Sequence, residues 1–204
     1  MTTMTGARGA RLAIDYPDRQ LDRPSTALRL FYVLPIAFLL GLIDSTTAGA
    51  GLGALAGGVL VVPVALTIVV RQKYPRWWFD FNLQLTRLAT RVVAYLALMT
   101  DRYPSTDEEQ SVHLDLDYPD VREELNRWLP LVKWLLAVPH YVALLLLSVA
   151  VAVSVIGAWV AVLVTGRYPR GVFDFVEGVL RWALRVDAYA FLLITDRYPP
   201  FSLA

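Results

Sequence analysis

Two long apolar stretches, residues 27–70 and 130–165, decide what this chain can fold into. A helix needs about 20 apolar residues to cross the hydrocarbon core of a bilayer, and each stretch exceeds that length. Only 18% of the 204 residues are charged, whereas soluble domains average about 25%. Because the apolar residues are gathered in long runs, the sequence predicts an all-α, polytopic membrane protein rather than one packed core.

Both stretches are too long for a single crossing, so we expect each to fold into a transmembrane helical hairpin. The first stretch breaks near Asp44, where several small residues favour a turn. The second would measure about 54 Å as one straight helix, so we place a turn near residues 148–154. All 19 lysines and arginines lie outside the two expected hairpin tips. The positive-inside rule then predicts four crossings with both termini in the cytoplasm.

A charged, aromatic phrase occurs twice, as KYPRWWFDF at residues 73–81 and as RYPRGVFDF at residues 167–175. Aligned at an offset of 94, residues 73–95 and 167–189 are identical at 12 of 23 positions. The phrase TDRYP follows each copy, and IDYPD and LDYPD come before them. The sequence therefore predicts a tandem duplication. The expected units are residues 1–104, an acidic linker at 105–113, and residues 114–204.

Residues 77–99 and 171–194 have a helical period with a charged stripe on one face. Two arginines at a bilayer centre would cost roughly 2.5–3.5 kcal/mol each on insertion scales. At the membrane interface the same side chains meet headgroups, so we expect two interfacial amphipathic helices on the cytoplasmic face. The alternative is that both segments span the bilayer, which would make the repeats inverted, as in many transporters. The stripes contain Asp80, Gln84, Arg87 and Arg91 in the first helix, and Asp174, Glu177, Arg181 and Arg185 in the second.

Tyr-Pro pairs at residues 74–75 and 168–169 mark the corners where a crossing ends and the chain turns along the surface. Tyrosine prefers the headgroup level of the membrane. The arginines that follow, Arg76 and Arg170, are then placed to reach lipid phosphates. We therefore expect both corners at one depth, on the same face.

Residues 111–118 have the period of a β-strand, because Val112, Leu114 and Leu116 alternate with polar residues. Pro119 ends the strand. We expect a minor sheet in which residues 199–203 are a second extended segment.

The segment TGRYPRGVFDFVEGVLRWALRVDAYAFLLITDRYPPFSL at residues 165–203 resembles the signature of an uncharacterised family of small bacterial membrane proteins. The resemblance extends to both halves as two tandem copies, and the second copy matches more closely. The first copy departs with Trp77 and Trp78 in place of Gly171 and Val172, and it lacks the PPFSL tail. The resemblance implies a protein of the bacterial inner membrane and supplies no activity.

The arginines of the corners and stripes are candidate sites for anionic lipid headgroups, because guanidinium groups suit phosphate oxygens. The competing interpretation is structural, with Glu177 and Arg181 as an i,i+4 ion pair. The lipid or anion candidates are Arg76, Arg87, Arg91, Arg170, Arg181 and Arg185.

Other residues are candidates for structural or partner contacts. Asp187 lies opposite the second stripe, towards the apolar side, and we expect it to pair with Lys133 or Arg127. Glycines spaced by four in residues 49–57 indicate close helix packing, within the chain or with another subunit. The full set is Asp80, Asp174, Glu177, Asp187, Gly49, Gly53 and Gly57.

The sequence disfavours several classes of function. A net charge of +1 gives no reason to expect nucleic acid, and cysteine is absent. His113 and His140 are isolated and make no metal site. No nucleophile elbow, HExxH or P-loop pattern occurs, so we expect no enzyme and no cofactor.

The preferred function is a non-enzymatic accessory or scaffold protein. Its expected partners are anionic lipid headgroups, other membrane proteins or further copies of this chain. The alternative is a small transporter or channel subunit in which the arginine stripes line a cavity. A membrane-embedded enzyme would need a reactive centre that the sequence does not show.

Overall fold

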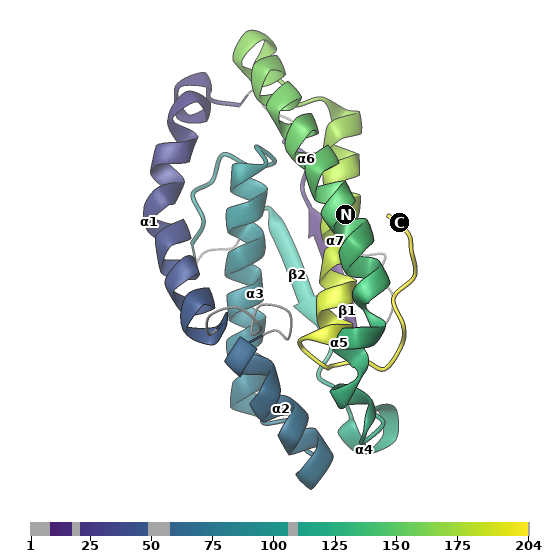
Figure 1. The fold of residues 1–204 in the computed structure, drawn as a ribbon. Coiled ribbons are helices and arrows are strands. Elements are labelled where there is room, and N and C mark those ends of the chain that lie inside the picture. The colour runs from purple at the N-terminus through teal and green to yellow at the C-terminus, as the bar shows by residue number, and fades with distance from the viewer. Residues whose placement is uncertain (1–8, 18–20, 49–57, 106–109, 204) are drawn as a thin grey trace.

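The structure is a computed structural model that describes residues 9–17, 21–48, 58–105 and 110–203 (Figure 1). It is mostly helical and contains one small sheet, as the sequence predicted. The elements are β1 (Ala10–Ile14), α1 (Arg23–Ala48), α2 (Gly58–Arg71), α3 (Arg76–Leu96), β2 (Val112–Leu116), α4 (Val121–Glu124), the 3-10 helix η2 (Leu129–Leu131), α5 (Lys133–Leu136), α6 (Val138–Thr165) and α7 (Arg170–Ala190).

The sheet consists of two antiparallel strands, β1 and β2, in which Leu12 faces Leu114. The strand predicted within residues 111–118 is confirmed as β2. Its partner is β1 and not residues 199–203, which lie outside the sheet. The sequence ARLAI of β1 lacks regular alternation, and four of its five residues are buried. A strand with this pattern is hard to recognise before its partner is known.

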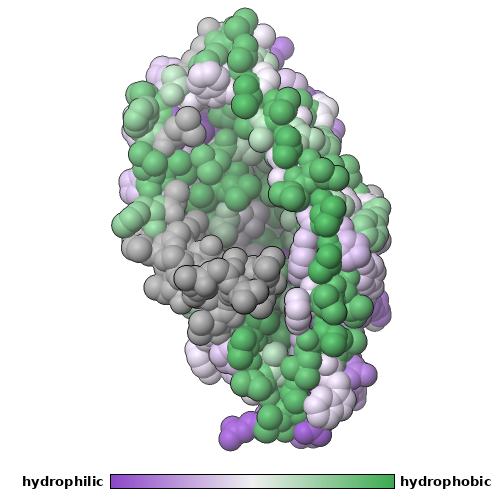
Figure 2. All heavy atoms as spheres, viewed as in Figure 1, coloured by the Kyte–Doolittle hydropathy of each residue, from purple (hydrophilic) through white to green (hydrophobic). Residues whose placement is uncertain are grey.

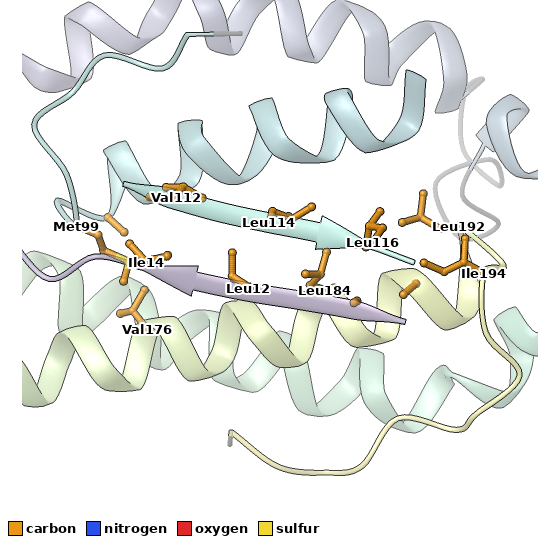
Figure 3. Packing of buried hydrophobic residues seen from close by; sticks show 14 of the residues in the cluster. Leu12, Ile14, Met99, Val112, Leu114, Leu116, Val176, Leu184, Leu192 and Ile194 are labelled. Carbon is orange, nitrogen blue, oxygen red and sulfur yellow. The ribbon is translucent and has the colours of Figure 1, made fainter. Parts of the chain in front are cut away.

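Two helices cover the sheet, one on each strand (Figure 3). α3 packs against β2, and α7 packs against β1. α7 therefore holds a strand from the opposite end of the chain, whereas β2 begins 16 positions after the end of α3. The core between these elements includes Leu12, Ile14, Leu114, Leu116, Val176, Leu184, Leu192 and Ile194, all of them buried.

The antiparallel sheet places the two Tyr-Pro corners at opposite ends. Tyr16 follows β1 and packs on the corner at residues 168–169, whereas Tyr118 follows β2 and packs on the corner at residues 74–75. The register pairs Ala10 with Leu116 and Ile14 with Val112, so Tyr16 and Tyr118 lie beyond opposite ends of the sheet. The prediction that both corners mark one face is therefore wrong. The strand pairing that separates them joins residues about a hundred positions apart, which no local pattern reveals.

The second apolar stretch does not form a hairpin. Residues 138–165 are one continuous helix, α6, so the turn predicted near residues 148–154 is wrong. Ser148 donates its hydroxyl proton to the carbonyl of Leu145 within the helix, and no proline interrupts this part of α6. Residues 129–136 form η2 and α5 instead, which shortens the helix to 28 residues, about 42 Å.

α7 returns alongside α6 instead of leaving it at a steep angle. The start of α6 lies against the end of α7, where Tyr141 stacks on Phe191 with ring centroids 5.8 Å apart. Ala137, just before α6, belongs to one cluster with Tyr189 and Ala190. The predicted arrangement of a crossing helix followed by a helix flat on the surface is therefore wrong for this pair.

The first apolar stretch contains two helices, α1 and α2, on either side of residues 49–57. Asp44 lies inside α1 and not at a turn, because the helix continues to Ala48. The glycine face at Gly49, Gly53 and Gly57 lies outside the described residues. Among the described residues one helix, α6, is long and apolar enough to cross a membrane. Multiple crossings and the orientation of the termini stay predictions.

Candidate functional site

The charged stripes of α3 and α7 face the sheet. Arg87 donates from Nε to the carbonyl oxygen of Leu114 over 2.9 Å, and Arg181 donates from Nε to that of Leu12 over 3.0 Å. Leu12 and Leu114 are the facing pair at the middle of the sheet. A two-stranded sheet leaves outward carbonyl groups without ladder partners, and these arginines satisfy one on each strand.

Glu177 completes the contact between α7 and β1. Its Oε1 accepts a hydrogen bond from the backbone N–H of Ile14 at 3.0 Å and pairs with Arg181 at 2.6 Å. The residue is only 8% exposed. The i,i+4 pair predicted as the structural interpretation is present, and it also joins α7 to the strand.

The next arginine of each stripe holds a segment that follows its helix. Arg91 donates to the carbonyl oxygen of Ser105, and Arg185 donates to that of Ser202. Asp80 and Asp174, the acids that begin the two stripes, are exposed. Whether the four arginines also contact lipid headgroups stays a prediction.

Each Tyr-Pro corner accepts a hydrogen bond from a tyrosine of the other half of the chain. The Tyr118 hydroxyl donates to the carbonyl oxygen of Tyr74 at 2.5 Å, and the Tyr16 hydroxyl donates to that of Tyr168 at 2.5 Å. Both rings pack edge-on against a phenylalanine of the repeated phrase, at 5.1 and 5.0 Å. The corner prolines start α3 and α7 and keep extended backbone angles.

The corner arginines lie over these tyrosine rings. The guanidinium carbon of Arg76 is 5.0 Å from the ring centre of Tyr118, and that of Arg170 is 4.5 Å from Tyr16. Both arginines are exposed, so their outer nitrogens remain available to other molecules. These contacts support a structural role, and lipid binding at these two residues stays a prediction.

Two buried ion pairs were not predicted from the sequence. Arg29 pairs with Asp101 and also donates to the carbonyl oxygens of Tyr95 and Thr100. Lys133 is fully buried and pairs with Asp196 at 2.7 Å. Burial lowers the pKa of the Lys133 ammonium group, and its hydrogen bond with Asp196 acts in the opposite direction.

A signal for these pairs was present in the repeated phrases. Asp101 and Asp196 occupy the same position of the two TDRYP phrases, and each apolar stretch contains one basic residue near its start, Arg29 or Lys133. Each cation also lies over a tyrosine: Arg29 is 4.4 Å from the ring centre of Tyr95, and Lys133 is 5.3 Å from that of Tyr189. Burying an ionised side chain in an apolar core is costly unless an opposite charge lies next to it.

Asp187 does not have the predicted partners. Lys133 pairs with Asp196, and Arg127 donates to the carbonyl oxygen of Val69. Although the residue is only half-buried, protein surrounds its carboxyl group deeply enough that desolvation raises its pKa to about 7. Nearby Tyr74 has a raised pKa, chiefly through its own burial and then through Asp187.

His140 anchors the C-terminal segment. It is fully buried, its Nδ1 accepts a hydrogen bond from Trp182 Nε1 at 3.1 Å, and its ring stacks on Phe201 at 3.9 Å. Within the described ranges, no three His, Cys, Asp or Glu residues come close enough together to hold a metal ion. The geometry at His140 is that of a packed aromatic cluster.

The second half of the chain is similar to a known protein family. A family model described as a domain of unknown function (DUF4389) matches residues 128–202. This range covers α5, α6, α7 and most of the C-terminal segment, so similarity to an uncharacterised family is confirmed for that part. A second copy in the first half stays a prediction. No curated protein and no solved structure matches the chain.

Proposed function

We propose that this chain is an integral membrane protein in which α6 crosses the bilayer, and that it acts as a non-enzymatic accessory or scaffold protein. The outward apolar face of α6 carries the proposal. Only 11% of its most apolar 18-residue window is buried against the rest of the protein. The large exposed side chains are Val142, Leu145, Leu146, Val149, Val153, Ile156, Val160 and Val164.

Such a face is costly in water and favourable in lipid. Burying one valine, leucine or isoleucine side chain away from water contributes roughly 1.5–3 kcal/mol. Hydrophobic residues form a nearly continuous surface along α6 and over α2 (Figure 2). At about 42 Å, α6 is longer than a hydrocarbon core of about 30 Å and fits it with a tilt.

The hydrogen bonds and ion pairs of the charged groups within the protein support the scaffold role. The stripe arginines bond to backbone carbonyls, and the buried cations pair with the TDRYP aspartates. Among the residues that the structure describes, the apolar helix faces and the exposed cations near the corners are available to other molecules. Partner membrane proteins and anionic lipids are the molecules that suit such surfaces.

A second candidate is a small transporter or channel subunit. Two observations favour it. The stripe arginines Arg87 and Arg181 lie along the sheet and are partly buried. The antiparallel pairing of β1 with β2 places the two halves in opposite directions. The outer face of the sheet also carries charge, with Arg11 Nη2 2.8 Å from Asp117 Oδ1. Inverted halves around a polar interior are a common transporter plan.

Single-cysteine labelling tests the crossing, because the chain has no native cysteine. We expect Leu135→Cys and Thr165→Cys to label from opposite sides of the membrane and Val149→Cys to be protected. Labelling of all three from one side would overturn the membrane-spanning assignment. Labelling of Leu180→Cys, beside Arg181, from both sides would favour the transporter instead.

A further inference from the structure

An open groove lies where α2 ends and the chain turns into α3. Its volume is about 380 Å³. Two parts of the chain form it, the corner before α3 and the segment that runs from the end of β2 into the start of α4. They are Gln72, Lys73, Tyr74, Tyr118, Pro119, Asp120, Val121 and Arg122.

The floor of the groove is held by the corner contacts. Tyr118 donates its hydroxyl proton to the carbonyl oxygen of Tyr74, and its ring lies 5.1 Å from that of Phe79. Tyr74 is 4% exposed and donates its own hydroxyl proton to the carbonyl oxygen of Leu192 at 2.8 Å. The groove is therefore a preformed part of the fold.

The rim of the groove is positively charged. Lys73 and Arg122 are both exposed, and neither side chain takes part in an ion pair among the residues that the structure describes. The one acid of the lining, Asp120, caps α4: its carboxylate accepts from the backbone N–H groups of Arg122 and Glu123 at 3.1 and 3.4 Å. Two cations therefore face the groove beside a carboxylate that is already hydrogen-bonded, which favours an anionic ligand.

An apolar stripe leads to the groove along α2. Val62, Leu66 and Val70 are spaced by four residues, so they share one face of the helix. They are 53%, 54% and 67% exposed. This stripe ends at Val70, one residue before the end of α2 and three positions before Lys73 of the groove. A ligand with a charged head and apolar chains fits both surfaces at once.

Exposed tryptophans surround this end of the molecule. Trp77 is 69% exposed and Trp128 is 63% exposed. Arg127 donates from Nε to the carbonyl oxygen of Val69, which fixes the segment of Trp128 against α2. The start of α6 lies just beyond η2, which also contacts α2. Tryptophan gathers at the headgroup level of membranes, so the groove lies at that level when α6 crosses.

We propose that this groove binds the phosphate of an anionic lipid headgroup. Lys73 and Arg122 contact the phosphate oxygens, and the acyl chains lie along Val62, Leu66 and Val70. The proposal rests on the proposed function, because it requires α2 to face the bilayer. It adds a defined site to a general affinity for anionic lipid.

The test measures how much phosphatidylglycerol the full chain retains in detergent, by native mass spectrometry, against phosphatidylcholine with the same acyl chains. The variant is Lys73→Gln combined with Arg122→Gln. The matched control is Arg167→Gln combined with Arg197→Gln, two exposed cations outside the groove. We expect roughly a 25-fold loss of affinity for the groove variant, about five-fold per charge, and less than about two-fold for the control.

Three results would overturn the proposal. The groove variant could keep its phosphatidylglycerol, or both double variants could lose it equally, which would indicate diffuse charge. Inorganic phosphate in excess could displace the lipid, which would make a soluble phosphate the ligand. The labelling pattern at the ends of α6 is independent of all three results, so failure of the groove is distinguishable from failure of the membrane assignment.

Discussion

Arg87 donates a hydrogen bond of 2.9 Å from its Nε to the carbonyl oxygen of Leu114. The facing residue of the other strand, Leu12, receives the same bond from Arg181 at 3.0 Å. The two arginines occupy the same position in the two copies of the repeated phrase. Arginines of α3 and α7 therefore stabilise the sheet through hydrogen bonds. The stability of the sheet depends on residues that the sequence pattern assigned to the surface.

Replacement of Glu177 tests this contact. In Glu177→Ala the N–H of Ile14 loses its acceptor and Arg181 loses its ion-pair partner, both at a site with little solvent. We expect the free energy of unfolding to fall by about 2–4 kcal/mol, measured by denaturant titration in detergent. Glu123→Ala, at an exposed acid of α4, is the control and should change it by less than about 0.5 kcal/mol. Equal effects of the two substitutions would contradict the role of Glu177.

Asp187 predicts a pH dependence. Its pKa is about 7 in the folded protein, above the ordinary aspartate value of 3.8, so the folded state holds the proton at pH values where the unfolded state has lost it. The contribution to stability is therefore complete below about pH 4 and declines as the pH rises towards 7. We expect Asp187→Asn to raise the thermal midpoint at pH 8 and to leave it nearly unchanged at pH 4. A shift of the same size at both pH values would contradict the raised pKa.

The two corner tyrosines, Tyr74 and Tyr168, should respond differently when each is replaced by phenylalanine. Tyr74 donates to the carbonyl oxygen of Leu192, so Tyr74→Phe should cost about 1 kcal/mol. The buried hydroxyl of Tyr168 has no partner among the described residues, so Tyr168→Phe should be neutral or stabilising. Equal losses in the two variants would indicate that the Tyr168 hydroxyl is hydrogen-bonded.

The same two tyrosines predict that the free energy of unfolding falls at high pH. Burial raises the pKa of both hydroxyls above 10, so their contribution is complete below pH 10 and is lost as the pH rises beyond it. We expect Tyr168→Phe to reduce this alkaline loss in a titration of tryptophan fluorescence. An unchanged alkaline transition would contradict the raised pKa of Tyr168.

The close approach of Leu203 to Gly178 predicts that the C-terminal segment is held against α7 at this glycine. A Cβ atom there would lie 2.8 Å from the carbonyl oxygen of Leu203, whereas one at Gly171 meets nothing within 4 Å. Both residues lie in α7, so alanine should favour the helix by up to about 1 kcal/mol at Gly171 and destabilise or release the tail at Gly178. Limited proteolysis of the C-terminus distinguishes them, and equal protection of both variants would contradict the close contact.

Local patterns in the sequence predicted the local structure well. The alternation of Val112, Leu114 and Leu116 identified β2, and the helical period after each corner identified α3 and α7. The Tyr-Pro corners lie after the ends of α2 and α6, as expected. These features depend on residues a few positions apart, which is the range over which periodicity is informative.

Features set by distant contacts could not be predicted in the same way. The charged stripes look like a surface because their partners lie beyond the range of helical periodicity. Leu114 is 27 positions from Arg87, and Leu12 is 169 positions from Arg181. The serines at 148 and 154 suggested a turn, but Ser148 bonds within α6. The sequence suggested Lys133 as a partner for Asp187. The actual partner of Lys133 is Asp196, which the turn after α7 brings beside it, and no local pattern shows that turn.

The pairing of β1 with β2 also has a consequence for synthesis. The ribosome completes β1 about a hundred residues before β2, and α7, which covers β1, follows later still. Contacts between such distant segments form late and slow folding. A nascent chain would therefore carry an unpaired, apolar N-terminal strand through most of its translation. Premature termination before α7 should leave that strand exposed and prone to aggregate.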